Sequence, residues 1–137
     1  MPSYTQGYVR ARRIDAEALG ANAVTLNGGL TTSSVDISGY NQLKLSCVRV
    51  NNSGTATSFY FETSEDGGTT WLRRQSGAIS GGTETLNNHT VSRAIAQLAF
   101  DYYLPIVGDT GDLLRVVFAD TSDAADFITA QVTLGVV

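Results

Sequence analysis

The sequence predicts an all-β fold, an antiparallel β-sandwich or jelly roll of about eight strands with an N-terminal arm. After Gly20, apolar and polar residues alternate with a period of two over much of the chain, turn-forming clusters separate these stretches, and no helix-period pattern follows. A chain of 137 residues is expected to build a single core. We therefore predict an N-terminal arm over residues 1–20 and one β-sandwich domain over residues 21–137.

The arm differs from the body because it shows no comparable alternation. Ile14 to Leu19 could form about one and a half helical turns ending at Gly20, which would be marginal unless the segment docks on something. The arm mixes apolar anchors with cations, a combination that favours docking on a partly acidic protein surface. The residues predicted to bind a partner are Tyr4, Tyr8, Arg10, Arg12, Arg13, Ile14 and Leu19. We expect deletion of residues 1–19 to leave the body folded.

Strands are predicted wherever the alternation is regular, because one face of each strand is then apolar. The stretches are Val35–Ile37, Leu43–Cys47, Phe59–Phe61, Leu98–Leu104, Leu114–Phe118 and Ile128–Val136. The turn clusters between them are 51–54, 66–68, 80–82, 108–111 and 120–123. The alternation slips at Val48, Arg49 and Val50, which indicates a bulge or a change of sheet. Residues 77–96 are the least defined: 83–90 is a candidate strand, and 92–95 a turn or a single helical turn.

One local motif stands out, Ser64-Glu65-Asp66-Gly67-Gly68-Thr69-Thr70-Trp71. It resembles the Asp-box of sialidase-like propellers, Ser-x-Asp-x-Gly-x-Thr-Trp, at every defining position. The resemblance implies a β-hairpin in which the Ser and Asp side chains bond to the turn backbone and the Trp packs beneath it. The residues predicted for this structural role are Ser64, Asp66, Gly68, Thr70 and Trp71. Since the motif occurs once, it implies a folded hairpin and no sialidase activity.

Composition and charge exclude several classes of protein. The net charge of -4 and Lys44 as the only lysine argue against a nucleic-acid partner, because phosphate binding needs clustered cations. No apolar stretch resembles a signal peptide or a membrane span, so we expect synthesis in the cytoplasm and no membrane association. Cys47 is the only cysteine, and its place in an apolar alternation predicts a small buried side chain.

No constellation of residues predicts an enzyme. His89 is the only histidine, and nothing marks a serine and a carboxylate that would complete a triad, or enough soft ligands for zinc. Five aspartates flank the strand around residues 113–119 and could either bind calcium or form ordinary Asx turns: Asp109, Asp112, Asp120, Asp123 and Asp126. We predict no catalytic residue, no metal site and no cofactor.

Aromatic side chains offer an alternative, a surface for stacking sugars. The candidates are Tyr4, Tyr8, Tyr40, Tyr60, Tyr102, Tyr103 and Trp71. The alternation assigns Tyr102 to the core face, and the hairpin motif accounts for Trp71. The sequence therefore leaves a carbohydrate-binding module as a less favoured alternative.

Four sequence segments spread over the body resemble segments of a family of virion proteins. They are Val35-Asp36-Ile37-Ser38-Gly39-Tyr40 before a Leu-x-Leu strand, the Ser64–Trp71 hairpin, Tyr103-Leu104-Pro105 before a Gly-Asp turn, and the terminal strand Ile128–Val136. Together they resemble the small β-sandwich virion proteins of tailed phages, particularly capsid decoration (cement) proteins. The resemblance covers residues 35–137.

The resemblance implies a structural role. Decoration proteins bind the outer capsid lattice, often as trimers, and clamp neighbouring capsomers. We therefore expect a virion protein whose partners are the major capsid protein or other virion proteins, which forms a homotrimer, and whose arm makes inter-subunit contacts. The alternatives are another virion component, such as a tail, neck or fibre module, and the carbohydrate-binding module.

Overall fold

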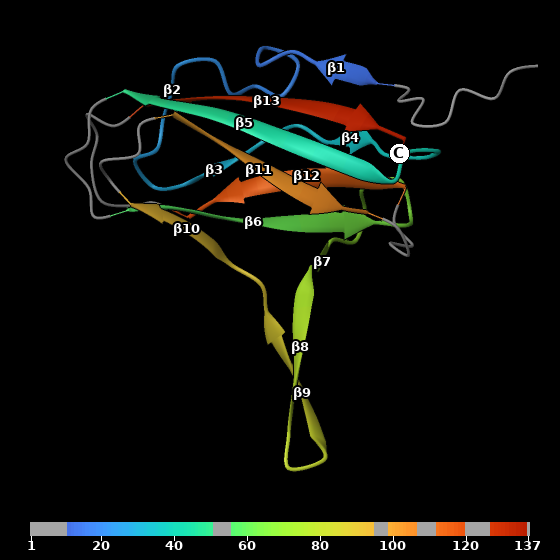
Figure 1. Cartoon of the computed structure of the whole chain (residues 1–137). Helices are drawn as coiled ribbons and strands as arrows, with labels where there is room; N and C mark the ends of the chain where they lie inside the picture. The colour runs from blue at the N-terminus through green and yellow to red at the C-terminus, as the bar shows by residue number, and fades with distance from the viewer. Residues whose placement is uncertain (1–10, 51–55, 95–98, 107–111, 120–126, 137) are drawn as a thin grey trace, which may run out of the picture.

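The chain is all-β in its computed structural model, which describes residues 11–50, 56–94, 99–106, 112–119 and 127–136 (Figure 1). Thirteen strands are present in this part of the chain, and every strand pairing is antiparallel. The predicted all-β class and antiparallel pairing are confirmed. The number of strands exceeds the expected eight, partly because four of them have only two residues and carry no visible alternation.

Two larger sheets face each other across one core (Figure 1). The first sheet has the order β1-β13-β5-β11, and β2 also pairs with β13. Its strands are β1 (Arg12–Ile14), β2 (Val24–Thr25), β5 (Gln42–Val50), β11 (Ala99–Pro105) and β13 (Phe127–Gly135). The second sheet has the order β10-β6-β12-β3, with β4 on β12 and β7 on β6. Its strands are β3 (Leu30–Thr31), β4 (Val35–Asp36), β6 (Ala56–Ser64), β7 (Leu72–Arg73), β10 (Val91–Ala94) and β12 (Leu113–Phe118). These two sheets and the turns that join them are called the body below.

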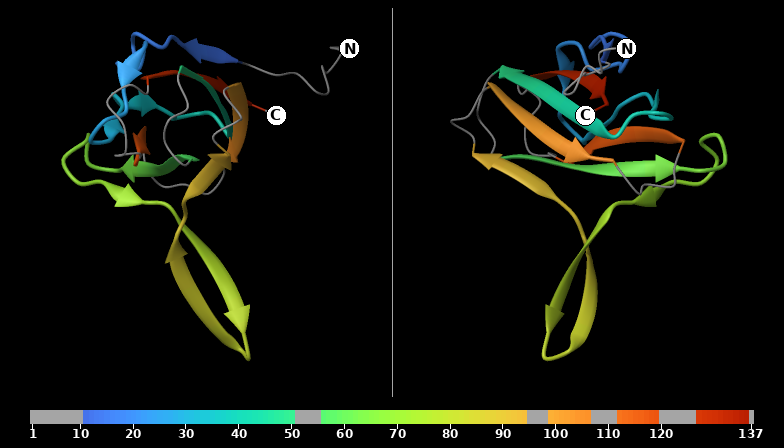
Figure 2. Two further views of the ribbon diagram at one scale, coloured as in Figure 1. Left: turned by 90° about the vertical axis from the view of Figure 1, so that its left-hand side faces the viewer. Right: turned by 45° about the vertical axis from the view of Figure 1, so that its right-hand side comes forward.

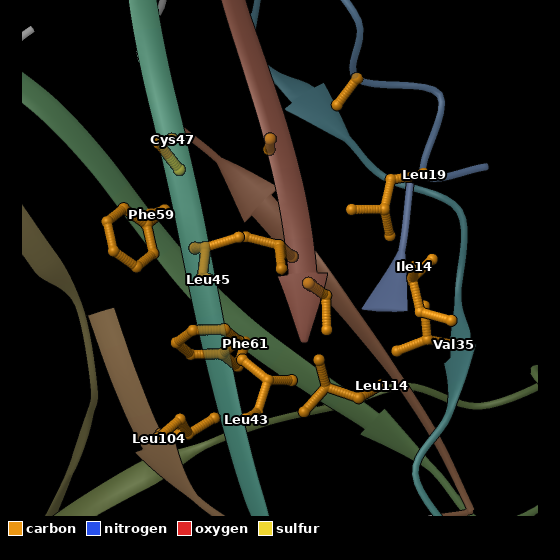
Figure 3. Packing of buried hydrophobic residues seen from close by; sticks show 14 of the residues in the cluster. Ile14, Leu19, Val35, Leu43, Leu45, Cys47, Phe59, Phe61, Leu104 and Leu114 are labelled. Carbon is orange, nitrogen blue, oxygen red and sulfur yellow. The ribbon is translucent and has the colours of Figure 1, made fainter. Parts of the chain in front are cut away.

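The core forms because each long strand turns alternate residues inward, as a half-buried strand must. In β5, and in β13 up to Leu134, the buried residues follow a period of two, and the partners Leu45 and Val132 lie directly opposite each other. Phe59 and Phe61 of β6 enter the core from the second sheet (Figure 3). Cys47 is 2% exposed, as predicted, and burial raises the pKa of its thiol to about 12, with a further contribution from Asp101. Cys47 is therefore a packing residue.

The predicted slip at Val48 is wrong. β5 pairs with β13 without a break from Gln42 to Val50, so the alternation continues and Arg49 is the residue that turns inward. Arg49 is 2% exposed, and its Nη1 donates a hydrogen bond of 2.6 Å to the buried Thr57 Oγ1. Val48 and Val50 point outward instead, 51% and 55% exposed. The prediction failed because it assumed that the valines, rather than the arginine, would be buried.

Residues 12–21 belong to the body, which differs from the boundary predicted at residue 20. β1 pairs with the edge of β13, and the chain then makes a turn in which the amide of Ala21 donates to the carbonyl of Ala16. Gly20, with a φ of 67°, ends this turn, which is too short to be the predicted helix. Ile14 and Leu19 are 9% and 1% exposed and form part of the core (Figure 3).

A third sheet, the hairpin of β8 (Gln75–Ser80) and β9 (Thr83–Asn88), stands away from the body (Figure 2). The views in Figures 1 and 2 agree that its tip points away from both larger sheets. β10 then returns the chain to the body by pairing with β6 from Val91 to Ala94. This strand corrects the prediction of a turn or a helical turn beginning at Ser92.

Candidate functional site

The loop between β6 and β7 is held together by the side chains of Ser64 and Asp66. Ser64 Oγ donates to Asp66 Oδ1 at 2.8 Å and accepts from the amide of Gly68 at 2.9 Å. Asp66 Oδ1 also accepts from the amides of Thr69 and Thr70, at 3.1 Å and 2.8 Å. These bonds replace water at turn amides that no strand partner satisfies. The loop is a rigid connection with a structural role.

These bonds hold the pKa of Asp66 well below its ordinary value of 3.8, at about 2. The amide of Thr70 contributes most, followed by the hydroxyls of Ser64 and Thr70. Because the pKa is lower in the folded state, ionised Asp66 stabilises the fold fully above about pH 4, and this contribution is lost as the pH falls towards 2.

We expect the Asp66 carboxyl to titrate near pH 2 in the folded protein when followed by NMR. Asp66→Asn should lower the thermal midpoint at pH 7, and the difference from the wild type should shrink as the pH falls from about 4 to about 2. The neighbouring Glu65→Gln, an exposed residue of the same loop, serves as the control. A midpoint of titration near 4 would show that the loop bonds do not hold in solution.

The outer face of the second sheet carries two aromatic rings, each covered by an arginine. Arg115 lies 4.1 Å above the centre of the Trp71 ring and donates to Glu62 Oε1 at 2.8 Å. Arg73 lies 3.7 Å above the centre of the Tyr60 ring. Sugars stack on open ring faces, and here the guanidinium groups occupy one face of each ring. The Trp71 and Tyr60 rings are therefore poor stacking platforms.

Trp71 is half-buried, so its removal should cost less than that of a core aromatic. Its Nε1 donates to the carbonyl of Gly68 at 3.0 Å, and Trp71→Ala removes this bond together with the Arg115 contact. We expect a loss of about 1–3 kcal/mol in unfolding free energy, measured by urea denaturation. Trp71→Phe should restore part of the loss because the stacking surface for Arg115 remains. A loss below about 0.5 kcal/mol would show that the loop does not depend on the indole.

The root of the β8–β9 hairpin is tied to the body on both sides. The amide of His89 donates to the carbonyl of Arg74, and the amide of Arg74 donates to the carbonyl of Phe61. Arg73 Nη2 bonds to the hydroxyl of Thr90, and Arg74 Nη2 donates to the carbonyl of Pro105 at 2.9 Å. The direction of the hairpin is thus set by the body, although its strands pair only with each other.

The sequence marked the turn of this hairpin at 80–82 and a candidate strand at 83–90, and both are confirmed, but it did not predict that the hairpin projects from the body. Gly81 and Gly82 form its turn with φ values of 58° and 79°, and two consecutive residues of positive φ are what a two-residue hairpin turn of type I′ requires. Their position between two six-residue stretches was the available signal. No local pattern tells whether such a hairpin lies on a body or projects from it.

The predicted partner-binding residues fall into three groups. Tyr4, Tyr8 and Arg10 lie outside the described residues. Ile14 and Leu19 are core residues of this chain, which removes them from any surface. Arg12 and Arg13 are exposed, and Arg13 Nη2 donates to Gln131 Oε1 at 2.8 Å on the neighbouring strand. Of the predicted partner-binding residues that the structure describes, only Arg12 and Arg13 lie together on the surface. The two apolar ones, Ile14 and Leu19, are buried.

The described residues that were considered for catalysis or metal binding, His89 and Asp112, do not form a common site. His89 lies beside the Tyr102 ring, with 6.5 Å between ring centres. Asp112 is exposed, and its amide donates to the carbonyl of Ser64. Asp109, Asp120, Asp123 and Asp126 lie outside the described residues. In the part of the chain that the structure describes, no three His, Cys, Asp or Glu side chains group as metal ligands, and no helix is long and apolar enough to cross a membrane.

The outer face of the first sheet exposes apolar side chains that the sequence did not mark. Val48, Val50 and Phe127 share one end of this face, and Val50 pairs with Phe127. Tyr103, 60% exposed, borders a shallow hollow of about 170 Å³ at the other end, together with Lys44 and Gly135. Of the aromatic residues considered for sugar stacking and described by the structure, Tyr103 is the most exposed.

No family model and no curated protein sequence matches the chain. Among solved structures it is similar to the SPBc2 prophage-derived protein YomS, with 14% identity over 93% of this chain and 95% of that chain, and a TM-score of 0.47. Structures of infectious bursal disease virus, strains Gx and Gt, match 93% of this chain at 12% and 13% identity, with TM-scores of 0.38 and 0.39. This chain spans 32% of the length of those two viral chains. Since each TM-score is below 0.5, the function below is argued from this chain's own residues.

Proposed function

We propose that this chain is a structural protein of a phage virion, a capsid decoration protein that binds the outer capsid lattice and stabilises contacts between capsomers. The observation that carries the proposal is a two-sheet body from which a hairpin projects, tied to the body at its root. A protein that joins neighbouring subunits needs a rigid body that sits on one of them and an element that reaches further. The resemblance of residues 35–137 to decoration proteins gives this architecture its most specific interpretation.

The binding surface for the capsid is proposed on the first sheet and the N-terminal segment. Arg12 and Arg13 are exposed at the sheet edge formed by β1, and the row of partners across the sheet from Arg13 leads through Lys44 to the exposed ring of Tyr103. Apolar side chains next to cations favour docking on a partly acidic protein surface. A trimer of the chain, made in the host cytoplasm, would present three such surfaces to the lattice and gain avidity from them. No enzymatic activity, cofactor, nucleic acid or membrane is part of this role.

A sedimentation experiment with purified capsid shells that lack the chain tests the proposal. We expect the wild type to pellet with the shells, and Arg12→Glu combined with Arg13→Glu to bind more weakly, with a larger difference at low salt because exposed charges are screened beyond about 8 Å at physiological salt. Thr31→Glu, at an exposed position of the opposite sheet, is the control for an added negative charge. Failure of the wild type to pellet with shells would contradict decoration. Pelleting with isolated tails instead would assign the chain to the tail or neck, the alternative that the same architecture supports.

A further inference from the structure

The strands of the β8–β9 hairpin are as long as ordinary strands, but they pair only with each other and with no further strand of the described chain. Each strand has six residues, and the ladder runs from the pair Gln75 and Asn88 to the pair Ser80 and Thr83. Every residue of β9 is exposed. An isolated two-stranded hairpin is at best marginally stable in water, and three or more strands or a packed face are needed for an independent sheet. The hairpin therefore lacks a packing partner within the described part of this chain.

The outer edges of β8 and β9 are unprotected. Proteins that keep an exposed edge in solution usually place lysine, proline or a bulge on it, because an open row of amides and carbonyls pairs with other chains. Residues 75–88 contain no lysine and no proline, and the ladder of β8 and β9 has no bulge. The edges are thus suited to pairing with another strand rather than to remaining in water.

The hairpin is nearly uncharged. Leu86 is 60% exposed and lies over the bare backbone of Gly77, where a Cβ would come within 3.6 Å of Leu86 Cδ2. Glu84 is the only charged residue in 75–88, whereas 16% of the whole chain is charged. A strip with a single ion and an exposed leucine can be covered by another surface without burying several charges.

Charge decides which partner fits best. A different protein that recognised the hairpin by complementary charge would need several charged side chains on it. Residues 75–88 contain only one, Glu84. Copies of the same chain bring identical charges together, so they can meet closely only where charge density is low. The chain carries a net charge of -4, and residues 75–88 contribute a single negative charge to it. The hairpin is thus a part of the molecule where two copies can approach with little repulsion.

We propose that the β8–β9 hairpin is a self-association element, in which the hairpins of neighbouring copies of this chain pair edge to edge. The two edges of one hairpin differ, since one belongs to β8 and the other to β9. Pairing of β8 in one copy with β9 in the next is a head-to-tail contact, which forms a ring when the rotation between copies closes and an open filament when it does not. A ring of three copies agrees with the trimer of the proposed function, although the inference concerns the free protein and does not depend on the capsid.

The mass of the protein in solution tests this proposal. Light scattering at tens of micromolar should give about three times the chain mass of 14.5 kDa for the wild type. Leu86→Lys places a repeated like charge at the contact and should weaken association by about a hundredfold or more, giving the mass of one chain. Leu72→Lys is the matched control, because Leu72 is a leucine of almost equal exposure, 61%, on the body. Circular dichroism and the unfolding midpoint of both variants establish that they fold.

Disulfide formation gives a second, independent test. Cys47 is buried, so Thr85→Cys introduces the one accessible thiol of the chain. With an added oxidant, a mixture of this variant with Ser76→Cys on β8 should form covalently linked dimers of the two, whereas a mixture of Thr85→Cys with Thr31→Cys on the body should remain uncrosslinked. A wild type that has the mass of one chain at these concentrations would overturn the proposal. So would a Leu86→Lys variant that keeps the wild-type mass.

Discussion

Deletion of residues 1–19 should destabilise the protein by about 4 kcal/mol or more, measured by urea denaturation. The deletion removes β1 and, with it, the buried side chains of Ile14, Ala16 and Leu19. Each buried leucine or isoleucine contributes about 2–5 kcal/mol when truncated to alanine, and the stability of a whole domain is about 5–15 kcal/mol. The truncated chain should therefore unfold far below the wild-type midpoint or fail to fold.

Two point variants show whether this loss comes from the core. Leu19→Ala alone should cost about 2–5 kcal/mol, because Leu19 is 1% exposed. Ala18→Ser, at the neighbouring exposed position, should change stability by less than about 0.5 kcal/mol. Equal stability of Leu19→Ala and the wild type would mean that residues 12–21 are an arm after all.

Phe59→Ala should cost about 3–5 kcal/mol of unfolding free energy. Phe59 is fully buried, and its ring centre lies 5.6 to 5.8 Å from those of Phe61, Phe100, Tyr102 and Phe118. The Phe100 ring stacks on it from the first sheet, at an interplanar angle of 11°. Phe59 therefore connects the two sheets, and its removal leaves a cavity that surrounding rings cannot fill without moving.

Urea denaturation of three variants checks this result. Phe59→Leu, which keeps most of the volume, should cost less than about 1.5 kcal/mol. Tyr103→Ala, on the outer face of β11 and 60% exposed, should cost less than about 1 kcal/mol. If Phe59→Ala and Tyr103→Ala had equal effects, the two sheets would not share the core described here.

The long strands could be predicted from the sequence because one face of each is buried. In β5, β12 and β13 alternate residues are buried, and most of these buried positions hold apolar residues, such as Leu43 and Leu134. Arg49 could not be predicted in this way, because its burial depends on Thr57, which reaches it from the other sheet. Burial of a polar residue is set by its partners, and those are known only once the sheets are placed.

Two further features depend on contacts distant in the chain. β1 has three residues, too few to show a period, and it is placed by β13, more than a hundred residues later. The hairpin turn at Gly81 and Gly82 was visible as a turn cluster, but its projection from the body follows from the bonds of Arg73 and Arg74 at its root. Of the candidate site residues, the motif at Ser64–Trp71 was readable because the side-chain hydrogen bonds that shape its loop are local, between residues at most four apart.

The proposed role predicts that the chain is part of purified phage particles, and its copy number in them tests that role most directly. Quantitative peptide mass spectrometry can measure this chain against the major capsid protein in the same particles. A decoration protein covers the lattice, so we predict a copy number that is a fixed, large fraction of that of the capsid protein. Absence of the chain from the particles would contradict a structural role in the virion.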